Sequence, residues 1–315
     1  MTIDLLSFIE VSAQRRAKLE AAGFAVHVAT QVAERLPACQ ALGRRVRVVL
    51  TNGITGVTAE QIAALPCLEL ISALGAGFEM IDLPAARARG IVVTHGPGTN
   101  TIAVADHAWA LLMSAGRDVV RADAQARREA WSKTCLRADI TGKRLGILGL
   151  GQIGMAIARR GAAGFDMDVA YHNRRPRNDV PYTYCPSVLA LAERSDFLVV
   201  ATPGGAGTTK LIDAAVLRAL GPDGFLVNIG RGSVVDTNAL IGALERGEIA
   251  GAGLDVVDSE PEVPPALAAL PNVVLTPHIA GHSANAVAAQ ERLLVENLQA
   301  HFGGQPVLTP VREAA

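Results

Sequence analysis

The stretch RLGILGLGQIGMAIARR, residues 144–160, decides the fold class. An apolar run leads into three closely spaced glycines and an Ala-rich run follows them, which predicts a strand, a tight turn and a helix. Gly149, Gly151 and Gly154 fit the GxGxxG pattern of dinucleotide-binding turns. Such glycines let the backbone approach a pyrophosphate closely, and the N–H groups that begin the helix bind its phosphates. A purely structural glycine turn is the alternative interpretation.

Short β-rich runs alternate with Ala-rich helical runs along nearly the whole chain. The predicted strands are apolar throughout rather than alternating, which is typical of a parallel sheet with helices on both faces. They form two series, the first at 24–28, 46–50, 68–72 and 91–94, and the second at 144–151, 168–172, 196–202, 224–230, 250–257 and 273–276. The sequence therefore predicts an α/β protein with two doubly wound parallel-sheet domains.

Two further helical segments are expected to link these domains. Residues 99–130 fall between the two strand series and are predicted to form a long connecting helix, apolar at first and charged later. A final helix over 283–302 has no strand after it, so it could return to the first domain. We therefore expect a discontinuous first domain, 1–98 plus 284–315, and a second domain over 99–283.

Composition excludes several classes of partner. Lys and Arg total 29 against 30 Asp and Glu, a formal net charge of -1, so there is no basic footprint for nucleic acid or for a membrane surface. Cys39, Cys67, Cys135 and Cys185 have neither metal-ligand spacing nor a disulfide pattern. The acidic N-terminus is unlike a signal peptide, and no apolar run reaches the length of a membrane span. We expect a cytoplasmic protein with a small-molecule partner and no metal.

The end of the second strand of the glycine-turn unit bears on cofactor choice. NAD-binding turns place an acid there to hold the ribose 2′-hydroxyl. Here the strand 168–172 is followed by Asn173, Arg174 and Arg175, with no acid. An arginine pair suits a 2′-phosphate, so NADP(H) is favoured over NAD(H). Because Arg177 lies close by as well, a solvated basic loop is the alternative.

Three chemistry-capable residues follow three predicted strands. Arg231 follows 224–230, Glu260 follows 250–257, and His278 follows 273–276. Carboxyl ends of parallel strands share one edge of a sheet, so the three are expected to face one site together with the glycine turn. Each alone has a plainer interpretation, as a surface charge, a turn acid and a capping or core histidine. Three such residues at three strand ends favour a catalytic site.

At these residues the sequence resembles the D-isomer-specific 2-hydroxyacid dehydrogenase family, particularly its glyoxylate/hydroxypyruvate reductase branch. The resemblance implies two Rossmann-like domains with an interdomain cleft, a flavodoxin-like substrate domain and a dinucleotide domain. It also implies a homodimer formed through residues 99–140, near Trp131. The motifs that carry it occur in family order and cover nearly the whole chain: GAGFEMID (75–82), NTIAVADHAWALL (100–112), GLGQIG (149–154), NIGRGSVVD (228–236), GAGLDVVDSEP (251–261) and TPHIAGHS (276–283).

The family's activity implies roles for individual residues. His278 would be the general acid/base that Glu260 orients and keeps charged, and Arg231 would bind the carboxylate and carbonyl of a 2-keto acid. The backbone of Gly75, Ala76 and Gly77 would bind the same carboxylate, and Asp255 would hold the nicotinamide carboxamide. The expected cofactor-binding residues are Gly149, Gly151, Gln152, Ile153, Gly154, Asn173, Arg174, Arg175, Thr202, Pro203, Thr208, Ile229, Asp255 and Ala280.

Two departures leave alternatives open. NAD-using members carry an acid where Asn173 stands, so the cofactor is inferred from NADP-using members alone. Leu74, Phe78 and Met80 around the substrate loop do not identify a substrate, so a bulkier 2-keto acid, a sugar acid, formate or phosphite stays possible. A non-enzymatic dinucleotide-sensing regulator is the rival from another class, although the intact trio argues against it. His95, His107 and His282 are expected to be structural.

Overall fold

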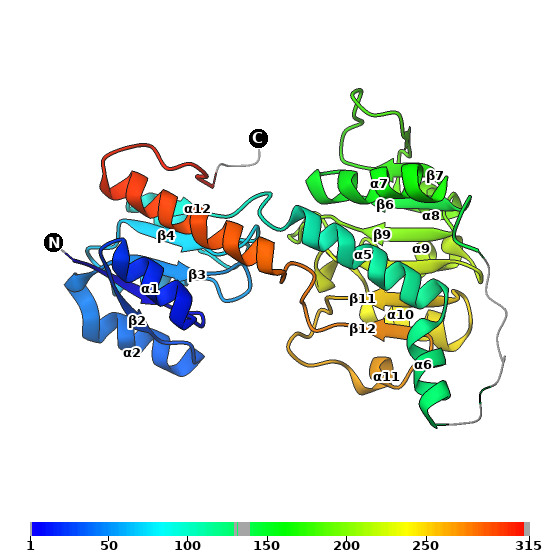
Figure 1. Cartoon of the computed structure of the whole chain (residues 1–315), viewed down its shortest axis with the longest axis horizontal. Coiled ribbons are helices and arrows are strands. Elements are labelled where there is room, and N and C mark those ends of the chain that lie inside the picture. Colours follow the sequence, from blue (N-terminus) through cyan, green and yellow to red (C-terminus); the bar gives the residue numbers. More distant parts are fainter. Residues whose placement is uncertain (1, 129–130, 132–138, 312–315) are drawn as a thin grey trace. The chain divides into compact units, whose positions relative to one another are not determined.

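The structure is a computed structural model that describes residues 2–128, 131 and 139–311. The chain divides into two compact units (Figure 1): unit 1 is Met1–Asn100 with Ser283–Ala315, and unit 2 is Thr101–His282. The sequence had placed these divisions after residue 98 and before residue 284. Cys135 and the last two residues of the expected connector, 129–130, lie outside the described residues.

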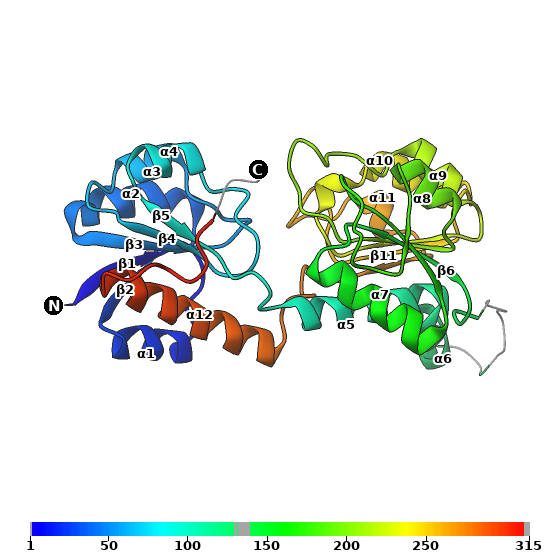
Figure 2. The same cartoon turned by 90° about the horizontal axis from the view of Figure 1, so that it is seen from above.

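Unit 1 is a five-stranded parallel sheet in the order β2-β1-β3-β4-β5. Its strands are β1 (Ile3–Ser7), β2 (Phe24–Val28), β3 (Val46–Thr51), β4 (Leu70–Ala73) and β5 (Val92–Thr94). On one face pack α1 (Ala13–Ala21) and α12 (Ala284–Phe302), and on the other α2 (Val32–Leu42), α3 (Ala59–Ala63) and α4 (Leu83–Ala88) (Figure 2). The final helix therefore belongs to unit 1, where Leu294 and Leu298 are buried against the sheet.

Unit 2 is a seven-stranded parallel sheet in the order β12-β11-β10-β9-β6-β7-β8. Its strands are β6 (Arg144–Leu148), β7 (Asp168–His172), β8 (Thr183–Tyr184), β9 (Phe197–Val200), β10 (Phe225–Asn228), β11 (Gly251–Leu254) and β12 (Val273–Leu275). The strand order reverses beside β6, the topology of dinucleotide-binding sheets. The turn after β6 thus lies where such folds bind their ligands.

Helices cover both faces of the unit 2 sheet, as the continuous apolar strands predict. One face is covered by α5 (Thr101–Gly116) and α7 (Gln152–Phe165). The other is covered by α8 (Val188–Glu193), α9 (Ala214–Leu220), α10 (Thr237–Glu245) and α11 (Pro265–Ala268). Two separate cores result, one on each side of the sheet. Among the described residues, no helix combines the length and apolar character that crossing a membrane requires.

The connector differs from the single helix that the sequence predicted. It consists of α5 and of α6 (Val119–Arg128), and the chain turns between them at Asp118, whose φ is 57°. The connector was predicted to contribute to a homodimer interface. Within one chain, α5 packs on α7, β10, β11 and β12 of its own unit. Its apolar residues are thus already buried within unit 2, and only Ile102 among its large apolar side chains is strongly exposed, at 63%.

Sequence analysis also missed a central strand. β1 (IDLLS) pairs with both β2 and β3, and its Leu5 and Leu6 are fully buried.

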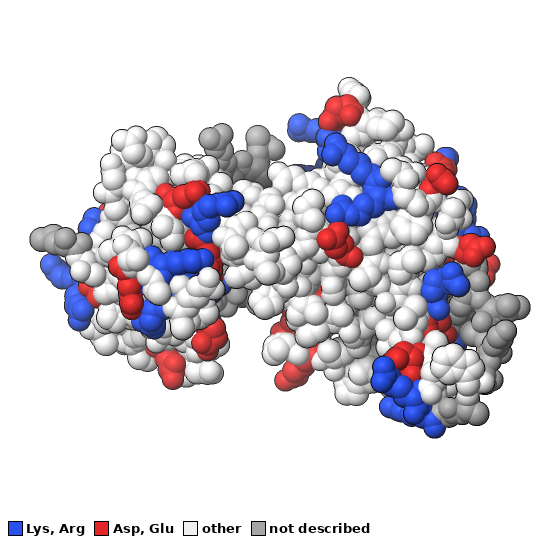
Figure 3. All heavy atoms as spheres, in the orientation of Figure 1, with Lys and Arg blue, Asp and Glu red and all other residues white. Residues whose placement is uncertain are grey.

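Surface charge fits the balanced composition, since Figure 3 shows Lys and Arg side chains interspersed with Asp and Glu on the face drawn.

Candidate active site

The ionisable residues of the predicted site all belong to unit 2 and follow three adjacent strands. Arg231 comes after β10, Glu260 after β11 and His278 after β12. The three strands are parallel and paired in register, β10 with β11 and β11 with β12. Their carboxyl ends therefore meet at one edge of the sheet, and the chain beyond each end can contribute to a common site.

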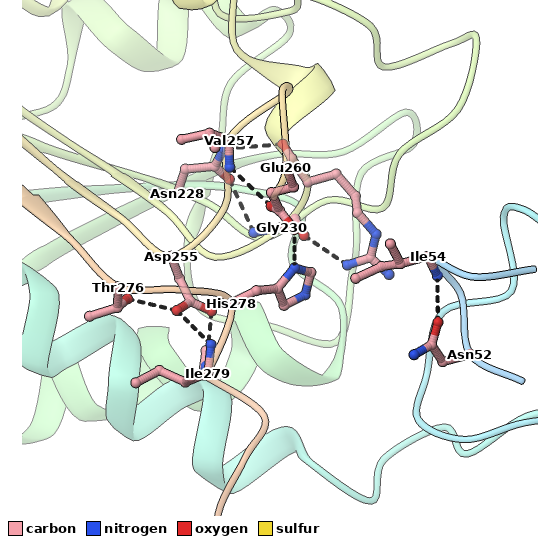
Figure 4. A network of polar contacts seen from close by, with 12 residues as sticks. Asn52, Ile54, Asn228, Gly230, Asp255, Val257, Glu260, Thr276, His278 and Ile279 are labelled. Atoms are coloured by element: carbon pink, nitrogen blue, oxygen red, sulfur yellow. Dashed lines mark hydrogen bonds and ion pairs between the residues drawn. The ribbon is translucent and has the colours of Figure 1, made fainter. Parts of the chain in front are cut away.

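Glu260 and His278 are in direct contact at this edge (Figure 4). The distance between Glu260 Oε2 and His278 Nδ1 is 2.7 Å, and the two side chains are 24% and 32% exposed. An ionised carboxylate can only accept hydrogen bonds, so Nδ1 carries a proton and donates it to Glu260. With Nδ1 engaged in this way, the other ring nitrogen, Nε2, is the one that could exchange a proton with a ligand.

The environment of Glu260 favours its ionised form. Burial by itself raises the pKa of the carboxyl group, because a charge is poorly solvated there. The hydrogen bond and charge of His278 act in the opposite direction, helped by the Val257 N–H and by the charge of Arg231. These contacts outweigh burial and hold the pKa of Glu260 below its usual range. The Val257 N–H donates to Glu260 Oε1 at 3.0 Å, so both carboxylate oxygens are engaged.

His278 has an unusual backbone conformation that its surroundings hold in place. Its φ is 53°, in the left-handed region that non-glycine residues seldom adopt. The His278 N–H donates to the Asp255 carbonyl at 2.9 Å. The next two N–H groups, of Ile279 and Ala280, donate to the Asp255 carboxylate, both at 2.9 Å. Asp255 thus fixes three successive amides of the loop that presents the imidazole.

Asp255 is part of a larger buried network. It is 2% exposed, and its Oδ1 also accepts a hydrogen bond from Thr276 Oγ1 at 2.6 Å. Since the Thr276 hydroxyl donates its proton to Asp255, it accepts one from His107 Nε2, 2.9 Å away on α5. Thr276 and His107 therefore support the His278 loop through Asp255. Sequence analysis missed both of these contacts and assigned His107 an unspecified structural role.

Arg231 is held by the turn that follows β10. Asn228, 1% exposed, accepts a hydrogen bond from the Gly230 N–H and donates one to the Arg231 carbonyl, both at 3.1 Å. Arg231 then leads into a short 3-10 turn, Gly232–Val234. A Cβ on Gly232 would lie 2.0 Å from the Val257 carbonyl carbon, so only glycine fits there. This close approach places the Arg231 turn directly against the segment that carries Glu260.

The glycine turn has the geometry of a dinucleotide site. Gly149 has φ 98°, and a Cβ there would lie 2.8 Å from the Thr202 nitrogen. A Cβ on Gly154 would lie 2.2 Å from the Gly149 carbonyl oxygen. Gly151, by contrast, has open space around its Cβ position and is the N-cap of α7, where no side chain caps the helix. Open space beside uncapped helix N–H groups suits a diphosphate.

The structure distinguishes four residues of the segment after β7 that the sequence could not rank. Asn173 Oδ1 accepts a hydrogen bond from the Leu150 N–H at 2.7 Å, so the Asn173 side chain fixes the backbone of the glycine turn. Arg177 is engaged by the Leu150 carbonyl and by Asp179. Arg174 and Arg175 are exposed, and no hydrogen bond or ion pair engages them within the described part of the chain. Of the three arginines that follow β7, Arg174 and Arg175 are therefore the two without a partner among the described residues.

The other expected cofactor residues take different positions around the same edge. Thr208 Oγ1 donates to the Pro203 carbonyl at 2.9 Å, which shapes the turn after β9 that begins with Thr202. Gln152 and Ile153 form the first turn of α7. Ile229 and Ala280 are 6% and 5% exposed and pack in the core beneath the site. Among the described residues, no group of His, Cys, Asp and Glu is arranged to hold a metal ion.

In unit 1, the Gly75–Gly77 loop follows β4 at the carboxyl edge of its sheet. Gly75 has φ 94°, a conformation suited to glycine. Leu74, Phe78 and Met80 flank the loop, and Met80 is 62% exposed. The polar groups of the loop are therefore backbone N–H and C=O groups rather than charged side chains.

Comparisons with known proteins agree with this geometry. Residues 109–280 match the family model "D-isomer specific 2-hydroxyacid dehydrogenase, NAD binding domain". Hydroxyphenylpyruvate reductase of Plectranthus scutellarioides is 44% identical over 84% of this chain and 85% of that protein. The 2-ketogluconate reductase of Gluconobacter oxydans is 44% identical over 84% of this chain and 86% of that protein. The match covers more than half of the chain, and both relatives are covered over most of their length.

A solved structure extends the likeness to the whole chain. The NADPH-dependent glyoxylate/hydroxypyruvate reductase of Sinorhizobium meliloti, in complex with NADP and malonate, superimposes with a TM-score of 0.92 at 38% identity and covers 100% of both chains. The chain belongs to the D-isomer-specific 2-hydroxyacid dehydrogenase family, within its branch similar to glyoxylate/hydroxypyruvate reductases. It is an NAD(P)-dependent oxidoreductase. Both the family and the two-domain fold predicted from the sequence are confirmed.

Proposed function

We propose that this enzyme reduces a small 2-keto acid, of the glyoxylate or hydroxypyruvate type, to the D-2-hydroxy acid, with NADPH as the favoured reductant. The observation that carries the proposal is the Glu260–His278 contact of 2.7 Å at the carboxyl edge of a dinucleotide-binding sheet. It supplies an oriented proton donor where the cofactor's dihydronicotinamide would supply hydride to C2 of the substrate. Oxygen then needs a proton, and the protonated His278 donates it through Nε2.

Charge and backbone donors bind the substrate's carboxylate. Arg231 offers a guanidinium that matches a carboxylate with two hydrogen bonds and can also polarise the adjacent C2 carbonyl. The amides of the Gly75–Gly77 loop are the second set of donors in this proposal. Glu260 stays ionised while His278 gains or loses its proton, because the low pKa of Glu260 favours the carboxylate. Asp255 holds the loop of His278, and we assign the nicotinamide carboxamide to its vicinity.

The preference for NADPH rests on the arginine pair. Arg174 and Arg175 follow β7, where an acid would repel a 2′-phosphate, and both are exposed. The S. meliloti relative, which was solved with NADP, supports the same choice. Gly149, Gly151 and Gly154 would hold the diphosphate, and the Thr202–Thr208 segment would line the cofactor site.

The names of the relatives do not identify one side chain for the substrate. They include an enzyme for hydroxyphenylpyruvate and one for 2-ketogluconate, so a bulkier keto acid or a sugar acid is the second candidate. The deciding experiment is steady-state reduction of glyoxylate, hydroxypyruvate, phenylpyruvate and 2-ketogluconate, each with NADPH and with NADH. We expect the highest kcat/KM for glyoxylate or hydroxypyruvate with NADPH. Turnover of none of the four would contradict the proposed function.

A homodimer and a cytoplasmic location complete the proposal. Since α5 is covered by its own unit, the support for an interface comes from exposed apolar residues that follow α5 in the chain. Val119 and Val120 on α6 are 52% and 53% exposed, and Trp131 is 91% exposed. Light scattering on the pure protein at micromolar concentration should give twice the mass of one chain. A stable monomer would contradict this part of the proposal.

A further inference from the structure

The side chain of His95 contacts the Gly75–Gly77 loop of unit 1. From the sequence, His95 was expected to have only a structural role. We propose that His95 is a positioning residue that aims the amides of this loop at the substrate's carboxylate. The inference rests on the proposed function, which assigns carboxylate binding to these amides. It adds a specific side chain that acts on the substrate through the loop.

The two carbonyl groups of the loop point toward the segment after β5. The Gly96 N–H donates to the Gly75 carbonyl at 2.6 Å, and the His95 Nδ1–H donates to the Ala76 carbonyl at 2.9 Å. A carbonyl only accepts hydrogen bonds, so Nδ1 is the protonated ring nitrogen. Successive peptide groups of the loop are therefore fixed by residues 95 and 96.

This anchoring determines where the N–H groups point. In a trans peptide, the C=O and the N–H of the same peptide plane point in opposite directions. Fixing the carbonyls of Gly75 and Ala76 therefore turns the N–H groups of Ala76 and Gly77 away from His95. Neither N–H donates a hydrogen bond to any described residue, and both residues are half-buried. Two adjacent, unpaired donors with a common direction form a concave site for an anion such as a carboxylate.

The opposite end of the loop packs against a turn that the Asn52 side chain closes. Asn52 Oδ1 accepts from the N–H groups of Ile54 and Thr55, at 3.0 and 2.7 Å, and so closes a tight turn. Figure 4 shows the bond to Ile54. A Cβ on Gly53 in that turn would lie 2.5 Å from the Gly77 carbonyl carbon. The turn therefore packs closely on the Gly77 end of the loop. At the Ala76 peptide, His95 is the side chain that provides the anchor.

No other described residue donates a hydrogen bond to the Ala76 carbonyl. The space beside the loop is small, about 10 Å³, and is lined in part by Leu74, Gly75, His95, Gln290 and Leu293. Without the imidazole donor, no hydrogen bond would fix the orientation of the Ala76 peptide. A rotated peptide would direct a carbonyl oxygen toward the substrate's carboxylate, which repels it.

His95 is itself held by the C-terminal segment. Its N–H donates to the Thr309 carbonyl at 3.2 Å, and Thr309 Oγ1 donates to the His95 carbonyl at 2.6 Å. Asn297 of α12, 1% exposed, donates to Thr309 Oγ1 at 2.9 Å. The ring packs edge-on against Phe78, with centroids 5.1 Å apart. The ring is therefore fixed before any substrate binds.

The test compares His95→Leu, which removes the donor, with His95→Asn, whose side-chain amide offers a donor near the position of Nδ1. The probe is oxamate, a carboxylate with an adjacent carbonyl that cannot accept hydride, titrated into the enzyme–NADPH complex by calorimetry. His95→Leu should weaken oxamate about 3- to 10-fold, the usual effect of one lost hydrogen bond. It should raise KM for hydroxypyruvate similarly with kcat nearly unchanged, because the contact is equally present before and during reaction. His95→Asn should restore both to within about twofold.

Two further variants guard against a general loss of structure. Thr309→Val removes the hydrogen bond from the Thr309 hydroxyl to the His95 carbonyl. It should weaken oxamate binding by a smaller factor than His95→Leu does. His27→Asn, on β2, should leave oxamate and hydroxypyruvate unaffected. NADPH affinity should stay constant in all four variants. The role of His95 would be overturned if His95→Leu bound oxamate as tightly as wild type, or if His95→Leu and His95→Asn lost equal oxamate affinity. Neither outcome would overturn the proposed function. A wild-type enzyme that neither binds oxamate nor reduces a keto acid would overturn the proposed function, and the His95 role with it.

Discussion

The two units share one way of winding strands and helices but place different chemistry at the ends of their strands. In unit 2, the strands β10 to β12 lead into Arg231, Asp255 and His278, all ionisable. In unit 1, the strands β3 to β5 lead into Asn52, the Gly75–Gly77 loop and His95, whose hydrogen bonds there involve backbone N–H or C=O groups. The fold supplies the edge where ligands bind, and in our proposal the residues after each strand decide whether that edge moves protons or binds an anion.

The difference extends to how each edge is supported. In unit 2 a buried carboxylate, Asp255, holds the key loop, whereas in unit 1 backbone contacts and one imidazole do so. Ionised partners make stronger hydrogen bonds than neutral ones. We therefore expect substitutions at the edge of unit 2 to reduce the rate strongly, and those at the edge of unit 1 to change affinity moderately.

The largest expected effect is the loss of the proton donor in unit 2. His278→Ala should lower the rate of keto-acid reduction by about 10²–10⁴, the usual contribution of a positioned acid. NADPH binding should stay largely intact because the glycine turn is separate. The matched control is His282→Ala, an exposed histidine four residues further on, which should keep nearly full activity. Stopped-flow single-turnover rates would measure this, and a His278→Ala enzyme with most of its rate would refute the assigned acid.

A core substitution in each unit should separate their stabilities. Leu298→Ala in α12 removes a fully buried side chain from unit 1 and should cost about 2–5 kcal/mol in that unit's free energy of unfolding. Leu112→Ala in α5, 1% exposed, is the matched change in unit 2. Both tryptophans, Trp109 and Trp131, belong to unit 2. Urea unfolding followed by tryptophan fluorescence should therefore respond to Leu112→Ala more than to Leu298→Ala, while circular dichroism should respond to both. Identical shifts in both signals would mean that the units unfold as one.

A smaller effect is expected at the arginine pair that follows β7. The double change of Arg174 and Arg175 to Ala should weaken NADPH by about tenfold or more, since charge-assisted hydrogen bonds contribute roughly 1.5–3 kcal/mol. NADH should scarcely be affected, because it lacks the 2′-phosphate. Arg159→Ala, an exposed arginine on α7, is the control for net charge. Fluorescence titration with both cofactors is the measurement. Equal losses for NADPH and NADH would show that the pair does not recognise the 2′-phosphate.

The smallest effect is a shift in pH dependence when Glu260 loses its charge. In the proposed mechanism, reduction requires protonated His278, and the Glu260 carboxylate stabilises that form. Glu260→Gln should therefore move the alkaline limb of the rate profile to lower pH. An upward movement would mean that Glu260 does not stabilise the imidazolium.

Stability should show the same contact at acid pH. The pKa of Glu260 is lowered in the folded protein, so its ionised form favours folding above the unfolded value of about 4.3. That contribution is lost as the pH falls through the lower folded-state pKa. The difference in unfolding free energy between wild type and Glu260→Gln should shrink over the same range.

Much of this organisation could be predicted because it depends on local pattern. Apolar runs marked most of the strands, and the spacing of Gly149, Gly151 and Gly154 marked a turn in which Gly149 and Gly154 have no room for a Cβ. The prediction failed for β1, because the short run IDLLS includes the polar residues Asp4 and Ser7 and gives no clear signal of a central strand. It also failed for the connector, where hydrophobicity indicated that α5 is buried but not against which surface.

The sequence by itself determined which chemical groups the protein has and where they lie relative to the strand ends. Because parallel strands end at one edge, Arg231, Glu260 and His278 could be grouped without coordinates. The tertiary structure alone decided the partners: His95 under the Ala76 carbonyl, His107 behind Thr276, and Arg177 engaged by Asp179. These contacts join residues that local pattern treats as equivalent histidines and arginines. They depend on distances between segments that only the packed chain defines, which is why composition and spacing could not rank them.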